Sequence, residues 1–144
     1  MNNLFMFDDN LAWRFDQTSE CICGRKTGVN ADWQPTADMY ETEETVMIHV
    51  ELAGIDKTSL RIAFQKGNVL IQGNRPLNPE MQSARIHQME QMYGTFERTF
   101  RIPTAVDIQQ ITAAYEFGML KITLPKQPER SDQQAIIPIT FTSS

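Results

Sequence analysis

The stretch "ITAAYEFGMLKITLP", residues 111–125, determines how this chain folds. Apolar residues alternate with polar ones on each side of Gly118. Because successive side chains of a strand point to opposite faces of a sheet, this alternation predicts two strands, each buried on one face. The glycine between them permits the tight turn of a hairpin. We therefore expect an antiparallel hairpin whose buried face carries Leu120, Ile122 and Leu124.

The same alternation recurs upstream of this hairpin. It is present in "TVMIHVEL" (45–52), "SLRIAF" (59–64) and "TFERTFRIP" (95–103). The segment "NVLIQG" (68–73) follows the second of these after the turn Lys66-Gly67-Asn68. No helical pattern separates these segments, and short alternating strands at this spacing are typical of a β-sandwich. We predict an all-β fold, an immunoglobulin-like antiparallel β-sandwich over residues 33–126.

Two segments of different character flank the predicted sandwich. Residues 1–32 begin with apolar side chains at helical spacing and continue into a linker, so we expect a partly helical N-terminal arm. The apolar residues of this arm are Leu4, Phe5, Phe7, Leu11, Trp13 and Phe15. Residues 127–144 form a polar run that leads to Ile137, Pro138 and Ile139, and we expect a flexible C-terminal tail. Because exposed isoleucines invite aggregation, this tail needs a surface that receives them.

A third unusual segment lies inside the sandwich. The stretch "NRPLNPEMQSARIHQMEQMYG" (74–94) has weak periodicity and is long for a connection between two strands. Such a loop is either disordered or ordered by a contact outside its own domain. In the strand that follows, Arg98 shares a face with two phenylalanines. Its head group either reaches water along an apolar stem or forms an ion pair across a subunit interface, and the sequence leaves both open.

The composition is that of an ordinary globular chain. Its 144 residues are 41% hydrophobic and carry a net charge of −5, with ten acidic against three basic residues in residues 1–51. This balance argues against nucleic acids and anionic membranes as partners, and no apolar run approaches the about 20 residues of a membrane span. The first residues lack the basic region of a secretion signal, so we expect a cytoplasmic protein. We expect Cys21 and Cys23 to be free thiols, with a redox or inter-subunit role as the alternative.

No catalytic, cofactor-binding or metal site emerges from the motifs. Neither of the two histidines lies within a nucleophile or metalloprotease pattern. "GIDKTS" (54–59) is a poor phosphate-binding loop, because Asp56 stands where glycine would precede the lysine, and we interpret it as a turn between strands. "ETEE" (41–44) lacks the spaced ligands of a calcium loop, and we expect a solvated turn or edge. We therefore expect neither an enzyme nor a cofactor.

Four stretches, in order, resemble the small heat-shock proteins, the family that contains an α-crystallin domain. "WQPTADMYETEETVMIHVELAGI" (33–55) resembles the opening of that domain, and "EQMYGTFERTFRIP" (90–103) resembles its G-x-F-x-R-x-F-x-x-P stretch. "AAYEFGMLKITLP" (113–125) resembles the family signature, and Ile137-Pro138-Ile139 resembles its isoleucine-x-isoleucine tail motif. Two positions depart from the family: Phe117 replaces a polar turn residue, and Gln91 replaces an arginine, which removes one possible ion pair between subunits.

The resemblance implies a use for each unusual segment. The tail would dock in a groove at the sandwich edge of another subunit, formed by Leu60, Ile62, Ile111 and Ala113. The long loop would exchange a short strand with a dimer partner, and the interface residues would be Ile86, His87, Met89, Glu90 and Arg98. A short apolar arm can pack inside an assembly and adapt to varied apolar surfaces when released, so we expect Leu4, Phe5, Phe7, Leu11, Trp13 and Phe15 to bind clients.

The function that the resemblance implies is that of an ATP-independent chaperone. Such a holdase binds partly unfolded proteins, limits their aggregation, and assembles from dimers into a larger homo-oligomer. Unfolding proteins associate through exposed apolar surface, and a protein with apolar segments of its own can compete for that surface. The alternative is a co-chaperone or interaction module of the CS-domain type, which gives no reason for the tail or the loop. A carbohydrate-binding sandwich would need a ligand constellation that the sequence lacks.

Overall fold

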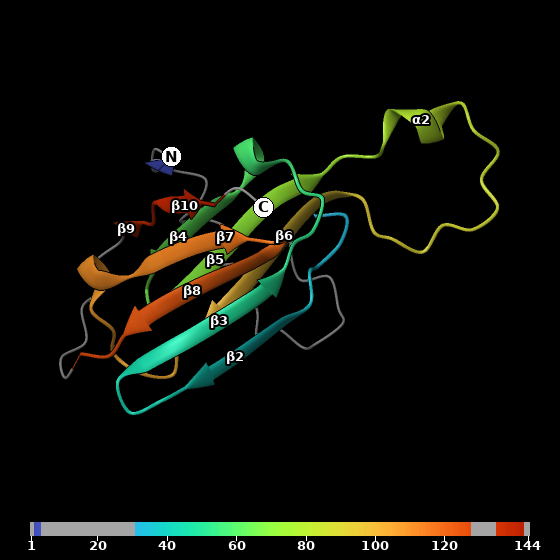
Figure 1. The fold of residues 1–144 in the computed structure, drawn as a ribbon. Coiled ribbons are helices and arrows are strands. Elements are labelled where there is room, and N and C mark those ends of the chain that lie inside the picture. The colour runs from blue at the N-terminus through green and yellow to red at the C-terminus, as the bar shows by residue number, and fades with distance from the viewer. Residues whose placement is uncertain (1, 4–30, 128–134, 143–144) are drawn as a thin grey trace.

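Two β-sheets packed face to face make up the part of the chain that the computed structural model describes, residues 2–3, 31–127 and 135–142 (Figure 1). The larger sheet has the strand order β1 (Asn2–Asn3), β10 (Ile139–Phe141), β7 (Thr112–Glu116), β8 (Met119–Pro125), β3 (Thr45–Glu51) and β2 (Ala37–Glu41). The smaller sheet has the order β6 (Gly94–Arg101), β5 (Asn68–Arg75), β4 (Arg61–Gln65) and β9 (Ala135–Ile136). Short helices η1 (Lys57–Ser59), α2 (Pro79–Gln82) and η2 (Ile108–Gln110) lie in the connections. The predicted all-β sandwich is confirmed, whereas the helical spacing of the arm lies outside the described residues.

The hairpin of β7 and β8 forms as the sequence predicts. Glu116 pairs with Met119, and the two residues between them both have positive φ, 52° for Phe117 and 76° for Gly118. Two consecutive positive φ values are what a two-residue hairpin turn requires, because only such a turn matches the right-handed twist of the strands. Gly118 adopts its φ without steric cost, whereas Phe117 does not.

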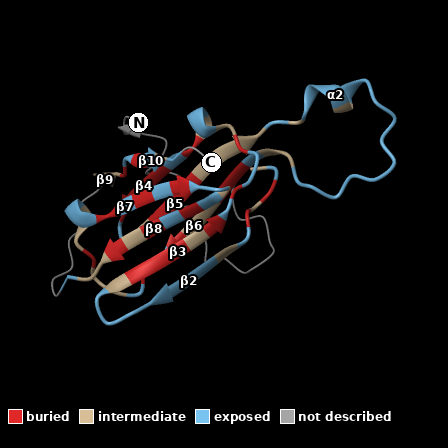
Figure 2. Ribbon diagram, viewed as in Figure 1, coloured by how far each residue is buried: buried red, intermediate tan, exposed pale blue. Residues whose placement is uncertain are grey.

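The core lies between the two sheets, where the inward residues of each strand meet (Figure 2). In β3 and β8, three cross-strand pairs are fully buried: Val46 with Leu124, Ile48 with Ile122, and Val50 with Leu120. The smaller sheet contributes Ile62, Ile71 and Phe96 to the same cluster. Burial of each such side chain contributes about 1.5–3 kcal/mol, so this layer holds the sheets together.

The connection between β5 and β6 leaves the sandwich, although the two strands pair along their length (Figure 1). We call residues 76–93 the projecting loop. Its short helix α2 begins at Asn78, whose side chain accepts a hydrogen bond from the Glu80 backbone N–H at 3.1 Å. Residues 82–92 are all exposed and contain no strand. The length and polar character of this segment place it in water rather than in the core.

The tail adds one strand to each sheet at the same edge of the sandwich. In the smaller sheet, Ile136 of β9 pairs with Ala63 of β4, and in the larger sheet β10 runs parallel to β7. Pro138 lies exposed between β9 and β10, where its missing N–H removes no ladder hydrogen bond. On the outer side of β10, Asn3 of β1 pairs with Ile139. The described part of the tail is therefore folded onto the sandwich.

Candidate assembly surfaces

The two tail isoleucines lie in a groove between the edges of the sheets. Ile137 is 2% exposed and Ile139 is fully buried, and both belong to the main core cluster. The backbone N–H of Ile137 donates to the carbonyl oxygen of Ile62 at 3.2 Å, and Ile139 lies in register with Ala113. The tail thus combines strand pairing with two buried side chains, which is the arrangement of a bound peptide added to a sheet edge.

The groove contains the four acceptor residues predicted from the sequence. Leu60, Ile62, Ile111 and Ala113 are all buried in the same cluster as the tail isoleucines. The structure describes one chain, and in that chain the tail occupies the chain's own groove. Docking of the tail on another subunit therefore stays a prediction.

Two aromatic residues that the sequence analysis missed extend the groove. The rings of Tyr115 and Phe141 pack with their centroids 6.0 Å apart, and the Tyr115 hydroxyl donates to the carbonyl oxygen of Leu52 at 2.8 Å. Burial raises the pKa of Tyr115 above its ordinary value, and the positive charge of Arg75 partly opposes that shift. The sequence could have indicated both residues. Tyr115 lies two residues after Ala113, and Phe141 lies two residues after Ile139, so each shares a strand face with a predicted groove or tail residue.

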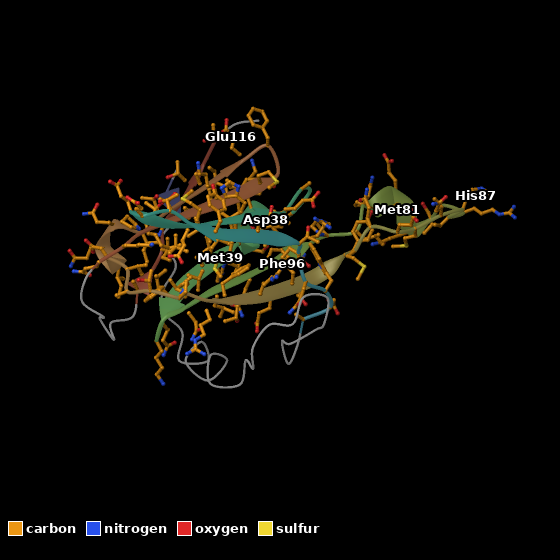
Figure 3. The ribbon with its side chains drawn as sticks, turned by 90° about the horizontal axis from the view of Figure 1, so that it is seen from below. Asp38, Met39, Met81, His87, Phe96 and Glu116 are labelled. Atoms are coloured by element: carbon orange, nitrogen blue, oxygen red, sulfur yellow. The ribbon has the colours of Figure 1, made fainter. Side chains whose placement is uncertain are left out.

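The projecting loop and the edge strand β2 expose the apolar residues that a dimer interface would use. Ile86 and Met89 in the loop are 45% and 50% exposed, and on β2 Met39 and Tyr40 are 43% and 47% exposed. The strand β2 ends the larger sheet, so one side of its backbone is open among the described strands. Figure 3 places Met39 over the sandwich and His87 at the far end of the loop, so one chain does not bring the two surfaces together. The sequence analysis did not single out β2.

Arg98 makes its contacts within its own chain. Its Nη1 donates to the carbonyl oxygen of Pro35 at 2.7 Å, and its guanidinium carbon lies 4.9 Å from the ring centroid of Phe100. Its Nε is buried without a hydrogen-bond partner among the described atoms. The side chain therefore fastens the segment that precedes β2 to the smaller sheet. This is a third arrangement beside the two that the sequence left open, and a role of Arg98 at a subunit interface stays a prediction.

A cluster at the base of the projecting loop was not visible in the sequence. The guanidinium of Arg75 lies 4.2 Å from the ring centroid of Trp33 and donates to the carbonyl oxygens of Ala53 (2.8 Å) and Met92 (3.0 Å). Trp33 in turn donates from Nε1 to the carbonyl oxygen of Gly94 at 3.0 Å. Because Arg75 precedes the loop and Met92 and Gly94 end it, this basal clamp fixes where the loop leaves the sandwich.

The polar motifs weighed for catalysis form turns and surface contacts. Asp56 accepts hydrogen bonds from the hydroxyl and the N–H of Thr58, at 2.6 and 3.0 Å, and these hydrogen bonds lower the pKa of Asp56. The turn interpretation of residues 54–59 is confirmed, since Asp56 caps η1. Glu41 of "ETEE" forms an ion pair with Lys126 at 2.8 Å. Within the described ranges, no three His, Cys, Asp or Glu side chains gather as metal ligands would.

The expectations about client binding and about the cysteines concern residues that the structure does not describe. The candidate client-binding residues Leu4, Phe5, Phe7, Leu11, Trp13 and Phe15 all lie outside them, as do Cys21 and Cys23. Among the helices that the structure does describe, none is long and apolar enough to span a bilayer.

These surfaces define a class of protein. The sandwich has an open edge strand, a projecting loop and a groove filled by the tail. These features are typical of β-sandwiches that bind other chains through the edges of their sheets. The chain belongs to the Hsp20/alpha crystallin family, which matches residues 38–140. It is a small heat-shock protein with a chaperone role, as the resemblance of its motifs implied.

Individual relatives agree with this assignment. The chain is 31% identical to the 17.6 kDa class I heat shock protein 3 of Arabidopsis thaliana over 115 residues, which cover 79% of this chain and 69% of that one. Its fold is similar to the crystal structure of hspA from Xanthomonas axonopodis, with a TM-score of 0.61, 34% identity, and coverage of 68% of this chain and 98% of that one. A small heat-shock protein of Xylella fastidiosa, described as having a distinct high order structure, gives a TM-score of 0.61 at 30% identity, with 72% and 94% covered.

Proposed function

We propose that the chain is an ATP-independent holdase that works in the cytoplasm as a homo-oligomer built from dimers, without catalytic chemistry of its own. The observation that carries the proposal is the way in which the sandwich edge is closed. The segment of β9 and β10 fills the groove. It can leave while the pairs β7–β8, β8–β3 and β3–β2 of the larger sheet stay intact. Release of that segment exposes apolar surface, and re-binding covers it again.

The tail is suited to link one subunit to another. Its spacer, residues 127–135, extends to about 30 Å, which is long enough to reach a neighbouring sandwich. Burial of Ile137 and Ile139 contributes roughly 3–6 kcal/mol, before the cost of ordering the tail is subtracted. One such contact is reversible, whereas several in a ring or shell give a stable assembly whose subunits still exchange. The acceptor in each neighbour is the groove of Leu60, Ile62, Ile111 and Ala113.

The dimer forms by exchange of projecting loops. In each subunit, residues 86–90 add as a short strand to the open edge of the partner's β2, with Ile86 and Met89 covering apolar residues of that strand. Because successive strand residues point to opposite faces, Ile86 shares its face with Glu90, and Met89 shares the other face with His87. The exchange satisfies the unpaired backbone groups of an edge strand, which otherwise promote aggregation. Arg98 supports this interface by holding the segment before β2 in place.

Clients bind to the apolar residues of the N-terminal arm, listed above from Leu4 to Phe15. Aromatic and long aliphatic side chains on a short segment can adapt to many partly unfolded surfaces, because no fixed pocket has to match one shape. The chaperone then lowers the concentration of aggregation-prone client without a chemical step.

The decisive experiment is light scattering of a heat-stressed model protein mixed with the full chain. We expect suppression of aggregation near one chaperone subunit per client and no change when ATP and Mg²⁺ are added. An equal mass of an unrelated β-sandwich protein is the control for crowding. Absence of suppression at an equal subunit ratio, or suppression only with ATP, would refute the proposal.

A further inference from the structure

The outer face of the smaller sheet carries a second apolar cluster, separate from the main core. Ala63 of β4 and Leu70 of β5 lie directly opposite each other on this face, and they form a cluster of their own. They point away from the core, because their neighbours Ile62, Phe64 and Ile71 point into it. Nevertheless Ala63 is only 4% exposed and Leu70 only 1% exposed.

Polar residues on the same face are covered as well. Gln65 is 1% exposed and Glu97 is 8% exposed. The Gln72 amide donates to the Glu97 carboxylate at 2.7 Å, whereas Gln65 Oε1 and Thr99 Oγ1 are buried without a hydrogen-bond partner among the described atoms. A polar group shielded from water without a partner is costly, so a native occupant that supplies partners is expected. We call Ala63, Gln65, Leu70, Gln72, Glu97 and Thr99 the outer-sheet face.

None of the described strands or helices lies over this face. The strands β4, β5 and β6 pack chiefly against one another, with β9 at the edge and η1 at one end. The outer side of a two-layer sandwich is normally wetted, and its residues are then polar and partly exposed. The low exposure of these residues is therefore not explained by the described strands and helices.

The N-terminal arm ends beside this face. The backbone N–H of Asp32 donates to the carbonyl oxygen of Thr95 at 2.9 Å, and the Asp32 carboxylate accepts from the Thr95 N–H (2.9 Å) and hydroxyl (3.0 Å). Thr95 precedes Glu97 and Thr99 on the outward side of β6. A cavity of about 280 Å³ at this point is lined by Ala31 together with Arg61, Gln72 and Glu97. The chain thus enters the described sandwich at one end of the outer-sheet face.

We propose that the outer-sheet face is the docking surface for residues 4–30 of the same chain. These 27 residues contain apolar side chains for Ala63 and Leu70 and abundant hydrogen-bonding groups for Gln65 and Thr99. Residues 128–134 are only seven residues long and consist of one proline and six polar residues, so they do not match the apolar centre.

The two native cysteines, Cys21 and Cys23, allow a direct test because both lie in the arm. The full-length variant Gln72→Cys is treated with a short bis-maleimide, and the matched control Lys121→Cys presents its thiol on the outer side of a central strand in the other sheet. We expect arm cross-links to position 72 to form at least about tenfold faster than to position 121, because docking raises the local concentration. Equal rates at the two positions would overturn the proposal.

Mixing ¹⁵N-labelled with unlabelled subunits before cross-linking separates docking within a chain from docking between chains. Cross-linked peptides that pair only like isotopes support the proposal, whereas mixed pairs assign the face to a second copy and overturn it. A second full-length variant, Leu70→Ser, should make tryptic cleavage at Arg14 several-fold faster, and Leu70→Ile should not. If a thermal melt shows that Leu70→Ser does not fold, the cross-linking rates still decide. None of these measurements involves a client, so they are independent of the holdase assay.

Discussion

At the scale of single residues, Phe117 is in backbone strain. Its φ of 52° lies in the left-handed region, and the residue is 73% exposed, so packing against the described residues offsets little of that strain. A bulky residue in this conformation costs roughly 1–2 kcal/mol, whereas asparagine tolerates it. The departure from the family turn that the sequence showed is therefore a destabilising one within the chain.

Replacement of Phe117 tests this account. We expect Phe117→Asn to raise the free energy of unfolding by about 1 kcal/mol, measured as the midpoint of urea unfolding at one fixed protein concentration. Glu116→Gln, on the adjacent strand position, serves as the control and should leave the midpoint unchanged. A lower midpoint for Phe117→Asn would mean that the exposed ring makes a stabilising contact with another chain.

Arg98 acts on stability through the Pro35 carbonyl rather than through a carboxylate. We expect Arg98→Ala to lower the free energy of unfolding by about 1.5–3 kcal/mol, because a hydrogen bond from a charged donor is lost. We also expect the dimer to dissociate at higher concentration, because the segment before β2 is released. Sedimentation velocity and urea unfolding measure the two effects, and Arg98→Lys, which keeps the charge but not the planar fork, should recover only part of each. A variant that unfolds and sediments like the parent would leave Arg98 without either role.

At the scale of elements, the contribution of the tail strands β9 and β10 to stability and assembly can be measured separately from that of the sandwich. The double variant Ile137→Ala, Ile139→Ala removes the two side chains that fill the groove and leaves the projecting loop intact. We expect the oligomer to fall toward dimers, measured by multi-angle light scattering, because loss of a buried isoleucine costs about 2–5 kcal/mol for each site. Thr142→Ala, at an exposed position beyond the same strand, is the control.

The same variant distinguishes the two places where the tail can dock. If the tail docks only on its own sandwich, the melting temperature falls while the mass of the oligomer stays the same. A change in neither quantity would remove the tail from both stability and assembly.

At the scale of the whole molecule, the described chain is a sandwich with a projecting loop and a tail folded onto its edge. Client binding is proposed for the N-terminal arm. We expect the triple variant Phe5→Ser, Phe7→Ser, Phe15→Ser to protect a heated client poorly while the sandwich stays folded at the temperature of the assay. The triple variant Asn10→Ser, Gln17→Ser, Thr18→Ser changes as many arm residues without removing apolar area and should protect normally. The measurement is client light scattering per subunit. Full protection by the phenylalanine variant would assign client binding to the sandwich.

Much of this molecule follows from local sequence. The period of two in β3, β4, β7 and β8 gives strands and the face that each one buries, because a strand alternates its side chains whatever its neighbours are. Gly118 fixes the hairpin turn for an equally local reason. The resemblance to the small heat-shock proteins pointed to the tail isoleucines and implied the groove residues Leu60, Ile62, Ile111 and Ala113. Docking of the tail there on another subunit stays a prediction.

The tertiary structure alone decided the contacts between residues far apart in the chain. Arg98 and Pro35 are 63 positions apart, and Trp33 and Gly94 are 61 positions apart. Nothing in the local pattern of these segments encodes either pairing. The same holds for the basal clamp of Arg75 and for the outer-sheet face, where Leu70 is buried on the side opposite to its neighbours Val69 and Ile71. Alternation specifies which side of a strand is apolar, but only the packed arrangement of all segments determines what lies against that side, because that contact depends on the free energy of the whole fold.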